Sequence, residues 1–245
     1  MFENPGYCWC CDKKTKFAVL RDECLNAKNW QIYRNHYKCV SCGSIPRERA
    51  LMYCVEKFFP GWRDSVIHES SPSQRGASVK LKQQARGYIP TQYYQDISPG
   101  AWHKEARCEN LECMTFEDGS VDLHITQDVL EHIFHPEMAF KEIARTLRPG
   151  GMHIFTVPLF NKGAPTEICA KLDDYGNIVH LREPEYHGNP ISDKGSLLTV
   201  RWGYDICDFI FKHSGLFTKI AYIDALEYGI RAEFIEVLIT AKPMN

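Results

Sequence analysis

Four cysteines near the N-terminus lie in two pairs whose spacing is typical of a metal site. Cys8 and Cys11 form one C-x2-C pair, and Cys39 and Cys42 form the second. Two such pairs supply four thiolates for a tetrahedral zinc ion, and Gly43 suits the tight turn that points backbone amides at sulfur. Because no histidine or carboxylate in the pattern leaves an open position, we expect a structural zinc ion rather than a catalytic one.

Two further cysteines in the same segment leave the ligand set open. Either Cys10 or Cys24 can replace one of the four ligands, and the alternative to zinc is a set of buried thiols. A module of this size does not fold without its metal. We place a zinc-ribbon-like module at residues 1–45, a linking helix at residues 46–60, and a larger domain at residues 61–245.

The larger domain is organised around residues 119–158, where the pattern is strand, helix, strand. An apolar strand at residues 121–126 precedes a helix that opens at Pro136, a stop at Pro149-Gly150-Gly151, and a second strand at residues 152–157. Proline suits the first helical turn because the amide that it lacks would be unpaired there, and Pro-Gly-Gly ends a helix sharply. Such a unit predicts two parallel strands joined by a right-handed crossover.

Three ordered motifs in this stretch resemble a known family. They are residues 118–122 (DGSVD), residues 127–132 (QDVLEH) and residues 142–151 (EIARTLRPGG). In this order and at these separations they resemble the S-adenosylmethionine-dependent methyltransferases with a Rossmann-like fold (methyltransferase type 11-like). The resemblance implies a doubly wound α/β fold with a seven-stranded, mostly parallel sheet whose last strand is reversed. It also implies S-adenosylmethionine as the cofactor.

The resemblance places the first cofactor contacts after an apolar strand that ends in Glu69. In the family, this acid meets the amino group of the methionine moiety through its bound network, and a glycine-rich turn lets the backbone approach the ligand. Here the turn contains Ser70, Ser71 and Pro72 instead of glycines. Small residues still admit the ligand, and serine hydroxyls can hydrogen-bond to it. The alternative is a degenerate site with weak or no cofactor binding.

Two more segments match cofactor positions of the family. Asp96 is the nearest acid after the second strand, where a carboxylate accepts hydrogen bonds from the ribose hydroxyls. Glu109, Asn110 and Leu111 resemble the segment that recognises adenine. Reading adenine needs one acceptor for its amino group and one donor for a ring nitrogen. Either Glu109 or Asn110 supplies the side-chain oxygen, and the following backbone amide donates.

Two polar residues follow the carboxyl end of the strand at residues 121–126. Gln127 and Asp128 follow this strand, at the edge where open α/β sheets bind ligands, so they contact the cofactor or face the acceptor. His132 is a candidate catalytic base in the next turn. In the resembled family, however, the Glu131-His132 pair often holds the turn instead.

An insertion at about residues 160–200 follows the second strand of this unit, where the resembled family builds its acceptor pocket. Its length and its aromatic and imidazole groups favour a shaped binding loop over disorder. Tyr186, His187 and Asn189 are the candidates for substrate binding. His187 is also the first candidate for a catalytic base, because an unperturbed imidazole pKa of about 6.5 suits general base catalysis. The alternative is a histidine that only fixes the loop.

Composition narrows the class of protein. The 245 residues are 44% hydrophobic and 24% charged, which is ordinary for a globular chain, and the formal net charge of -2 gives no overall attraction to nucleic acid. No apolar run is long enough to span a bilayer and no signal-peptide core is present, so we expect a cytoplasmic protein that does not bind membranes.

Three functions remain, in this order of preference. The first is O- or N-methyl transfer to a small molecule or glycan precursor, which the acidic charge and the long insertion favour. The second is RNA methylation, because some rRNA guanine methyltransferases also carry an N-terminal four-cysteine ribbon. That function would need a basic face from Lys13, Lys14, Lys16, Arg21 and Arg34. The third is a non-catalytic module that has lost its cofactor.

Overall fold

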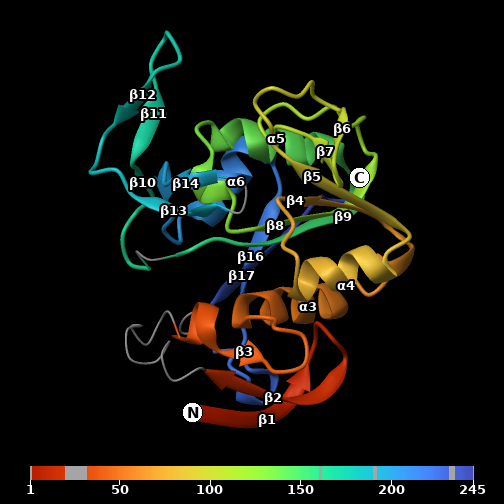
Figure 1. Cartoon of the computed structure of the whole chain (residues 1–245). Coiled ribbons are helices and arrows are strands. Elements are labelled where there is room, and N and C mark those ends of the chain that lie inside the picture. The colour runs from red at the N-terminus through yellow and green to blue at the C-terminus, as the bar shows by residue number, and fades with distance from the viewer. Residues whose placement is uncertain (1, 20–31, 160–161, 190–191, 232–234, 245) are drawn as a thin grey trace.

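A central sheet of eight strands forms the middle layer of the protein, in the order β16-β17-β9-β8-β4-β5-β7-β6 (Figure 1). The computed structural model describes residues 2–19, 32–159, 162–189, 192–231 and 235–244. The strands of the sheet are β4 (Val66–Ser70), β5 (Gly87–Gln92), β6 (Trp102–His103), β7 (Ala106–Cys108), β8 (Val121–Gln127), β9 (Leu147–Thr156), β16 (Phe217–Tyr222) and β17 (Glu236–Ala241).

The pairing of these strands confirms the predicted class of fold. The five adjacent strands β9, β8, β4, β5 and β7 all pair in parallel. β17 runs antiparallel to both of its neighbours, β9 and β16. The sheet is therefore mostly parallel, and the last strand β17 is reversed as predicted. The predicted count of seven is wrong, because the short edge strand β6 pairs antiparallel with β7. Residues 121–126 of β8 are all buried, as expected for a central parallel strand covered on both faces.

Helices cover both faces of the sheet. α3 (Pro46–Phe58) and α4 (Gly76–Gln84) lie on one face, and α5 (Pro136–Thr146) and α6 (Ile206–Ser214) lie on the other (Figure 1). α5 begins at Pro136 and ends before Pro149, as the sequence predicts. Among the described residues, no helix has the length and apolar character needed to cross a membrane.

The N-terminal module is a three-stranded antiparallel sheet of β1 (Phe2–Cys8), β2 (Lys13–Val19) and β3 (Lys38–Cys39). Two buried cationic side chains on the helices donate hydrogen bonds to its backbone. Arg49 of α3 donates hydrogen bonds to the carbonyl oxygens of Tyr37 (2.8 Å) and Gly229 (2.7 Å). Lys80 of α4 donates to the carbonyl oxygen of Trp9 (2.9 Å). Both cations are buried, so neither is a solvated helix charge.

One predicted strand of the module is a helical turn instead. The sequence suggests a strand at residues 30–33, of which residues 30–31 lie outside the described residues. The other two residues belong to η1 (Ile32–His36), a single wide turn of π-helix. This turn packs against α3 and places Arg34 in the interior.

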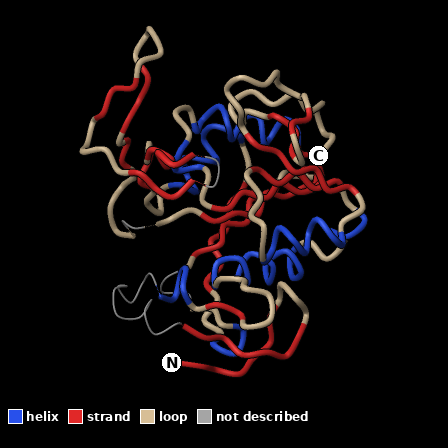
Figure 2. The backbone as a smooth tube through the Cα atoms, in the orientation of Figure 1, coloured by secondary structure: helices blue, strands red, loops and turns tan. Residues whose placement is uncertain are grey.

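The insertion is built from three short antiparallel pairs (Figure 2). They are β10 (Glu167–Ile168) with β15 (Val200–Arg201), β11 (Ala170–Leu172) with β12 (Ile178–His180), and β13 (Tyr186–Asn189) with β14 (Ser192–Leu197). The hairpin of β11 and β12 projects away from the body (Figure 1). The pair of β13 and β14 carries the predicted acceptor residues. The insertion is thus a shaped element, as predicted, although its strands are not visible in the sequence pattern.

Three buried histidines cross the sheet side by side. His68 of β4, His124 of β8 and His153 of β9 are paired positions in neighbouring strands. The Nδ1 atoms of His68 and His124 are 2.6 Å apart, so one donates and the other accepts. His153 stacks on Phe155 with ring centroids 4.2 Å apart. Burial lowers the pKa of His68 and of His153 to about 3, so both are neutral in the folded protein.

Candidate active site

Glu69 is the centre of a buried hydrogen-bond network at the carboxyl end of β4. It accepts hydrogen bonds from Ser78 Oγ (2.6 Å), Tyr88 Oη (2.7 Å) and Gln127 Nε2 (3.0 Å). Burial raises the pKa of Glu69. The structure therefore brings together two of the predicted cofactor residues, Glu69 and Gln127. Through these hydrogen bonds the carboxylate also connects the start of α4 to the end of β8.

The turn after β4 keeps the backbone geometry of a glycine-rich turn although it contains serine. Ser71 has a φ of 54°, in the left-handed region that glycine favours, and its amide donates to the Thr91 carbonyl oxygen (2.8 Å). A Cβ atom on Gly76 at the end of the turn would lie 2.1 Å from Glu48 Oε2. Ser70 is buried and Pro72 is half-buried. The contacts of Ser70, Ser71 and Pro72 with a cofactor stay predictions.

Asp128 joins the N-terminal module to the edge of the sheet. Its Oδ1 accepts hydrogen bonds from Arg34 Nη2 (2.7 Å) and Thr156 Oγ1 (2.9 Å), and its Oδ2 lies 3.3 Å from Arg47 Nε. Burial raises the pKa of Asp128, but the two guanidinium groups outweigh burial and hold this pKa below its usual value. Arg34, which the RNA methylation hypothesis would need on a basic face, is buried here. Sequence reasoning missed this role because nothing local to Arg34 indicates a partner almost a hundred residues away.

The remaining predicted cofactor residues lie farther along the same edge. Asp96 is exposed in a turn beyond the end of β5. The carboxylate of Glu109 accepts a hydrogen bond from the Thr115 amide (2.8 Å) and pairs with Arg107 Nε (2.9 Å), so it stabilises its own loop. Asn110 Oδ1 accepts from the amide of Glu112 (2.9 Å), and Leu111 is part of the buried core. The contacts of these residues with a cofactor stay predictions.

A second cluster lies where the insertion meets the turn after β8. His132 Nδ1 is 2.8 Å from the Leu197 carbonyl oxygen, and its ring centroid is 5.1 Å from that of His187, with the rings perpendicular. The amide of Thr199 donates to the Glu131 carbonyl oxygen (2.8 Å), which fixes the insertion on this turn. The structure therefore unites the two predicted catalytic histidines, from segments about 55 residues apart in the sequence.

Glu131 completes this cluster, which we call the Glu-His-His cluster (Glu131, His132 and His187). The ligand atoms of the three side chains all lie within 4.8 Å of one another. Burial, with a contribution from the charge of Asp128, raises the pKa of Glu131, and burial lowers the pKa of His132. Of the predicted substrate residues, Tyr186 is 55% exposed on β13. The side chain of Asn189 lies outside the described residues.

The four predicted zinc ligands form one group. Cys8 Sγ lies 3.8 Å from Cys42 Sγ, Cys11 Sγ lies 4.0 Å from Cys39 Sγ, and all four sulfur atoms lie within 4.8 Å of one another. Zn–S bonds of about 2.3 Å at tetrahedral angles place sulfurs about 3.8 Å apart. The arrangement therefore fits a tetrahedral zinc ion.

Both knuckles of this group share one backbone feature, because the residue after each C-x2-C pair has a positive φ, 55° at Asp12 and 69° at Gly43. Cys10 is buried outside the group, and burial raises its pKa, so it is a poorer thiolate ligand. Cys24 lies outside the described residues.

Comparison with known proteins finds a family match within the larger domain and solved structures with a similar fold. Residues 78–155 match the methyltransferase domain family. The CurJ carbon methyltransferase has a similar fold, with 12% identity, a TM-score of 0.50, and coverage of 87% of this chain and 57% of that one. An S-adenosylmethionine-dependent methyltransferase from Mesorhizobium loti aligns at 11% identity with a TM-score of 0.49, over 79% of this chain and 98% of that one.

A third structure, the 1,6-didemethyltoxoflavin-N1-methyltransferase of Burkholderia thailandensis with bound S-adenosylhomocysteine, aligns at 11% identity and a TM-score of 0.46, over 81% of this chain and 80% of that one. A comparison with curated proteins finds no match. The fold defines an α/β protein of the methyltransferase type. This fold agrees with the methyltransferase domain match over residues 78–155. The match begins in α4, after the serine-containing turn, which is the part that departs most from the family pattern.

Proposed function

We propose that the enzyme transfers a methyl group from S-adenosylmethionine to an oxygen or nitrogen atom of a small molecule or glycan precursor. The observation that carries the proposal is the Glu-His-His cluster, which the insertion completes at the carboxyl edge of the sheet. Methyl transfer from a sulfonium is an in-line displacement, so the protein has to align the acceptor, handle its proton and exclude water. The cluster supplies polar groups for the acceptor proton where the turn after β8 meets the insertion.

The two histidines have defined hydrogen-bonding states in this proposal. The carbonyl oxygen of Leu197 can only accept, so the Nδ1 atom of His132 carries the proton and its Nε2 atom has a free lone pair. Because burial lowers the pKa of His132, this lone pair is present at neutral pH. His187 is less buried and sits on the side of the insertion, where an acceptor would enter.

The N-terminal module has a structural role in the proposal. We assign residues 1–45 to a zinc ribbon, residues 46–60 to the linking helix, and residues 61–245 to the methyltransferase domain with its acceptor insertion at about residues 160–200. The group of four cysteines supports a structural zinc ion. The ion pair of Arg34 and Asp128 gives the ribbon a direct connection to the strand ends.

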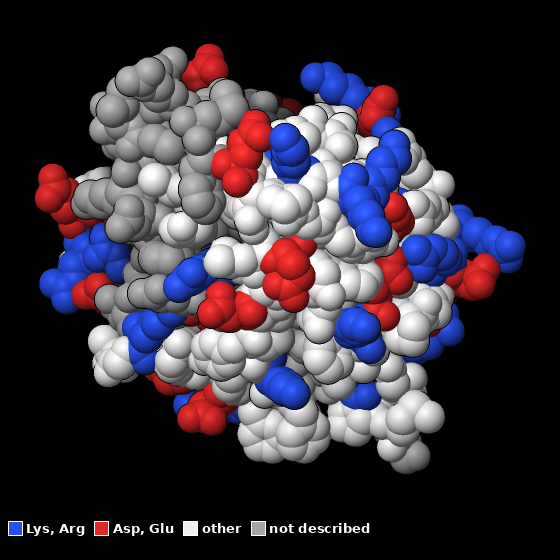
Figure 3. Space-filling view, turned by 90° about the horizontal axis from the view of Figure 1, so that it is seen from below, with Lys and Arg blue, Asp and Glu red and all other residues white. Residues whose placement is uncertain are grey.

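RNA methylation has less support. The ribbon face in Figure 3 shows Lys and Arg side chains interspersed with Asp and Glu. Lys16 pairs with Glu3 (3.2 Å), and Arg34 is buried, so neither offers an unpaired charge to phosphate. Arg21 lies outside the described residues.

The test is an assay of S-adenosylhomocysteine release with a panel of sugars, nucleotide sugars and small phenols or amines, and with transcribed rRNA fragments as the competing class. We expect turnover with a member of the small-molecule panel, and a loss of about 100-fold or more in the His187→Ala variant. The His180→Ala variant, on the exposed hairpin of the same insertion, is the matched control and keeps full activity. Methylation of rRNA without methylation of any small molecule would overturn the proposal.

A further inference from the structure

The side chain of Glu131 is a buried carboxylate that has no hydrogen-bond partner in the part of the chain that the structure describes. Its side chain is 1% exposed, and neither carboxylate oxygen has a hydrogen-bond partner among the described residues. Burying an ionised carboxylate is very costly unless it is paired or coordinates a metal ion. The nearest imidazole nitrogen, Nε2 of His132, is 3.8 Å from Oε1, which is too long for a hydrogen bond. Without a bound cation the raised pKa favours the protonated, neutral carboxyl group, whereas a cation at this position would stabilise the ionised form.

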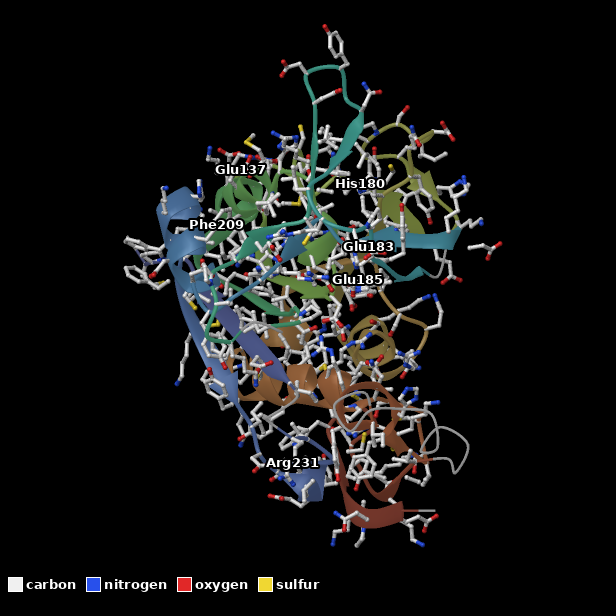
Figure 4. All side chains as sticks on the ribbon, turned by 90° about the vertical axis from the view of Figure 1, so that its left-hand side faces the viewer. Glu137, His180, Glu183, Glu185, Phe209 and Arg231 are labelled. Atoms are coloured by element: carbon white, nitrogen blue, oxygen red, sulfur yellow. The ribbon has the colours of Figure 1, made fainter. Side chains whose placement is uncertain are left out.

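The two histidines next to Glu131 are each held by an acceptor on one ring nitrogen. His132 is held by the Leu197 carbonyl oxygen, and His187 Nε2 lies 3.4 Å from Glu185 Oε1. Glu185 is itself fixed by Arg201 at 2.6 Å, and it lies at the base of the insertion in Figure 4. Histidines that ligate metals have the same arrangement, because a partner on one nitrogen fixes the tautomer and turns the other nitrogen toward the metal.

The spacing of the three side chains suits one cation. Metal–ligand bonds of about 2.1 Å at tetrahedral angles place two ligand atoms about 3.4 Å apart. The observed 3.8 Å between His132 and Glu131 differs from this by a few tenths of an ångström, and all three ligand atoms lie within 4.8 Å of one another. Small side-chain rotations would bring them to bonding distance. The two imidazoles belong to different elements, η3 (Leu130–His132) and β13, so the site forms only when the insertion is docked.

We propose that Glu131, His132 and His187 bind a divalent transition-metal ion. Two imidazoles and one carboxylate suit Mn²⁺, Fe²⁺, Co²⁺ or Zn²⁺, and three protein ligands leave positions open for an acceptor. Mg²⁺ and Ca²⁺ fit less well because both prefer oxygen ligands. This site is separate from the group of four cysteines, which has no open position.

The role of this ion rests on the proposed function. An ion with open positions binds two neighbouring oxygen atoms of the acceptor, such as a vicinal diol, and it lowers the pKa of a bound hydroxyl. When the ion occupies the imidazole lone pairs, the hydroxyl proton passes to solvent instead of to a histidine. The oxygen then forms a bond to the methyl carbon, and the carbon–sulfur bond breaks with its electron pair left on sulfur. Because the ion binds two neighbouring oxygen atoms, the expected acceptors are polyhydroxylated compounds, of which sugars are the main example.

The test uses Mn²⁺ titration followed by electron paramagnetic resonance, with full-length protein that holds zinc in its four-cysteine site. Thiolate sites prefer zinc to Mn²⁺, so the signal reports the new site. We expect one Mn²⁺ per chain in the wild type and in His180→Ala, and binding at least about tenfold weaker in Glu131→Gln and in His187→Ala. Co²⁺ titration, read from its visible absorption, repeats the comparison with a softer ion.

The outcomes separate the site from the enzyme reaction. Absence of saturable binding of both ions, or equal binding in all four proteins, would overturn the metal site. Titration of each variant with S-adenosylhomocysteine shows that it is folded. Metal binding that depends on Glu131 and His187, in a protein that methylates no small molecule, would keep the site and overturn the proposed function instead.

Discussion

Replacement of His153 by glutamine tests the row of buried histidines quantitatively. The ring of His153 is fully buried, its Nε2 atom lies 3.0 Å from Thr126 Oγ1, and burial lowers its pKa to about 3. In the unfolded chain the pKa of a histidine is about 6.5. Because the unfolded state binds the proton more readily, the free energy of unfolding falls as pH drops below about 6.5 and continues to fall until about pH 3.

The magnitude follows from these two pKa values. Between about pH 7.5 and 5.5, the unfolded imidazole passes from mostly neutral to mostly charged, while the folded one stays neutral. This difference lowers the free energy of unfolding by about 1.4 kcal/mol for one histidine. The His153→Gln variant lacks this contribution. Its stability should therefore fall by about 1.4 kcal/mol less than that of the wild type over the same pH range.

Urea unfolding followed by circular dichroism, in buffers with added zinc, measures this difference. A cost of the substitution that does not depend on pH cancels in the comparison, and so do the buried carboxylates, which both proteins share. The His180→Gln variant is the control, because this side chain is exposed, and its pH dependence should match the wild type. A wild-type and a His153→Gln profile that run parallel from pH 7.5 to 5.5 would refute the reasoning.

Three further predictions concern the site. Arg34→Met leaves Asp128 with one guanidinium partner, so it should lower the free energy of unfolding by about 3 kcal/mol in urea titrations. An unchanged midpoint of urea unfolding would show that the ion pair does not connect the ribbon to the sheet. The free energy of unfolding of Ser71→Gly should lie within about 1 kcal/mol of the wild-type value. That of Ser71→Val should be about 2 kcal/mol lower, because a β-branched residue is strained at the positive φ of position 71. Equal stability of the two variants would contradict this backbone conformation. Cys39→Ser should reduce bound zinc from one ion per chain to almost none by metal analysis, whereas full zinc content would show that another cysteine, such as Cys10, completes the site.

Local sequence signals suffice for much of the fold. Pro136 marks the start of α5, and the apolar run before Gln127 marks β8. The helix ends at Thr146, before Pro149-Gly150-Gly151, which the structure places in β9. β6 has only two residues and depends on pairing with β7, so no local pattern marks it. The strands of the insertion are also short, and β10 pairs with β15, which follows it by about 30 residues.

The site is harder to predict because it depends on contacts between distant segments. His132 and His187 are identifiable as candidates, but only the docking of Thr199 on the turn after β8 brings them together. Glu131 looks like a structural residue in the sequence, and its lack of hydrogen-bond partners is visible only in three dimensions. Arg34 looks like a surface charge in the sequence, and only the fold pairs it with Asp128, the residue after β8.

Calorimetric titration with S-adenosylmethionine and S-adenosylhomocysteine tests the central claim most directly. The protein should be zinc-replete, and Gln127→Ala and His180→Ala should be titrated beside the wild type. We predict saturable binding of one ligand per chain in the wild type and in His180→Ala. Binding should be at least about tenfold weaker in Gln127→Ala, which removes a side chain from the network at the cofactor edge. Absence of binding of both ligands to the folded wild type would contradict the assignment of this edge as a cofactor site.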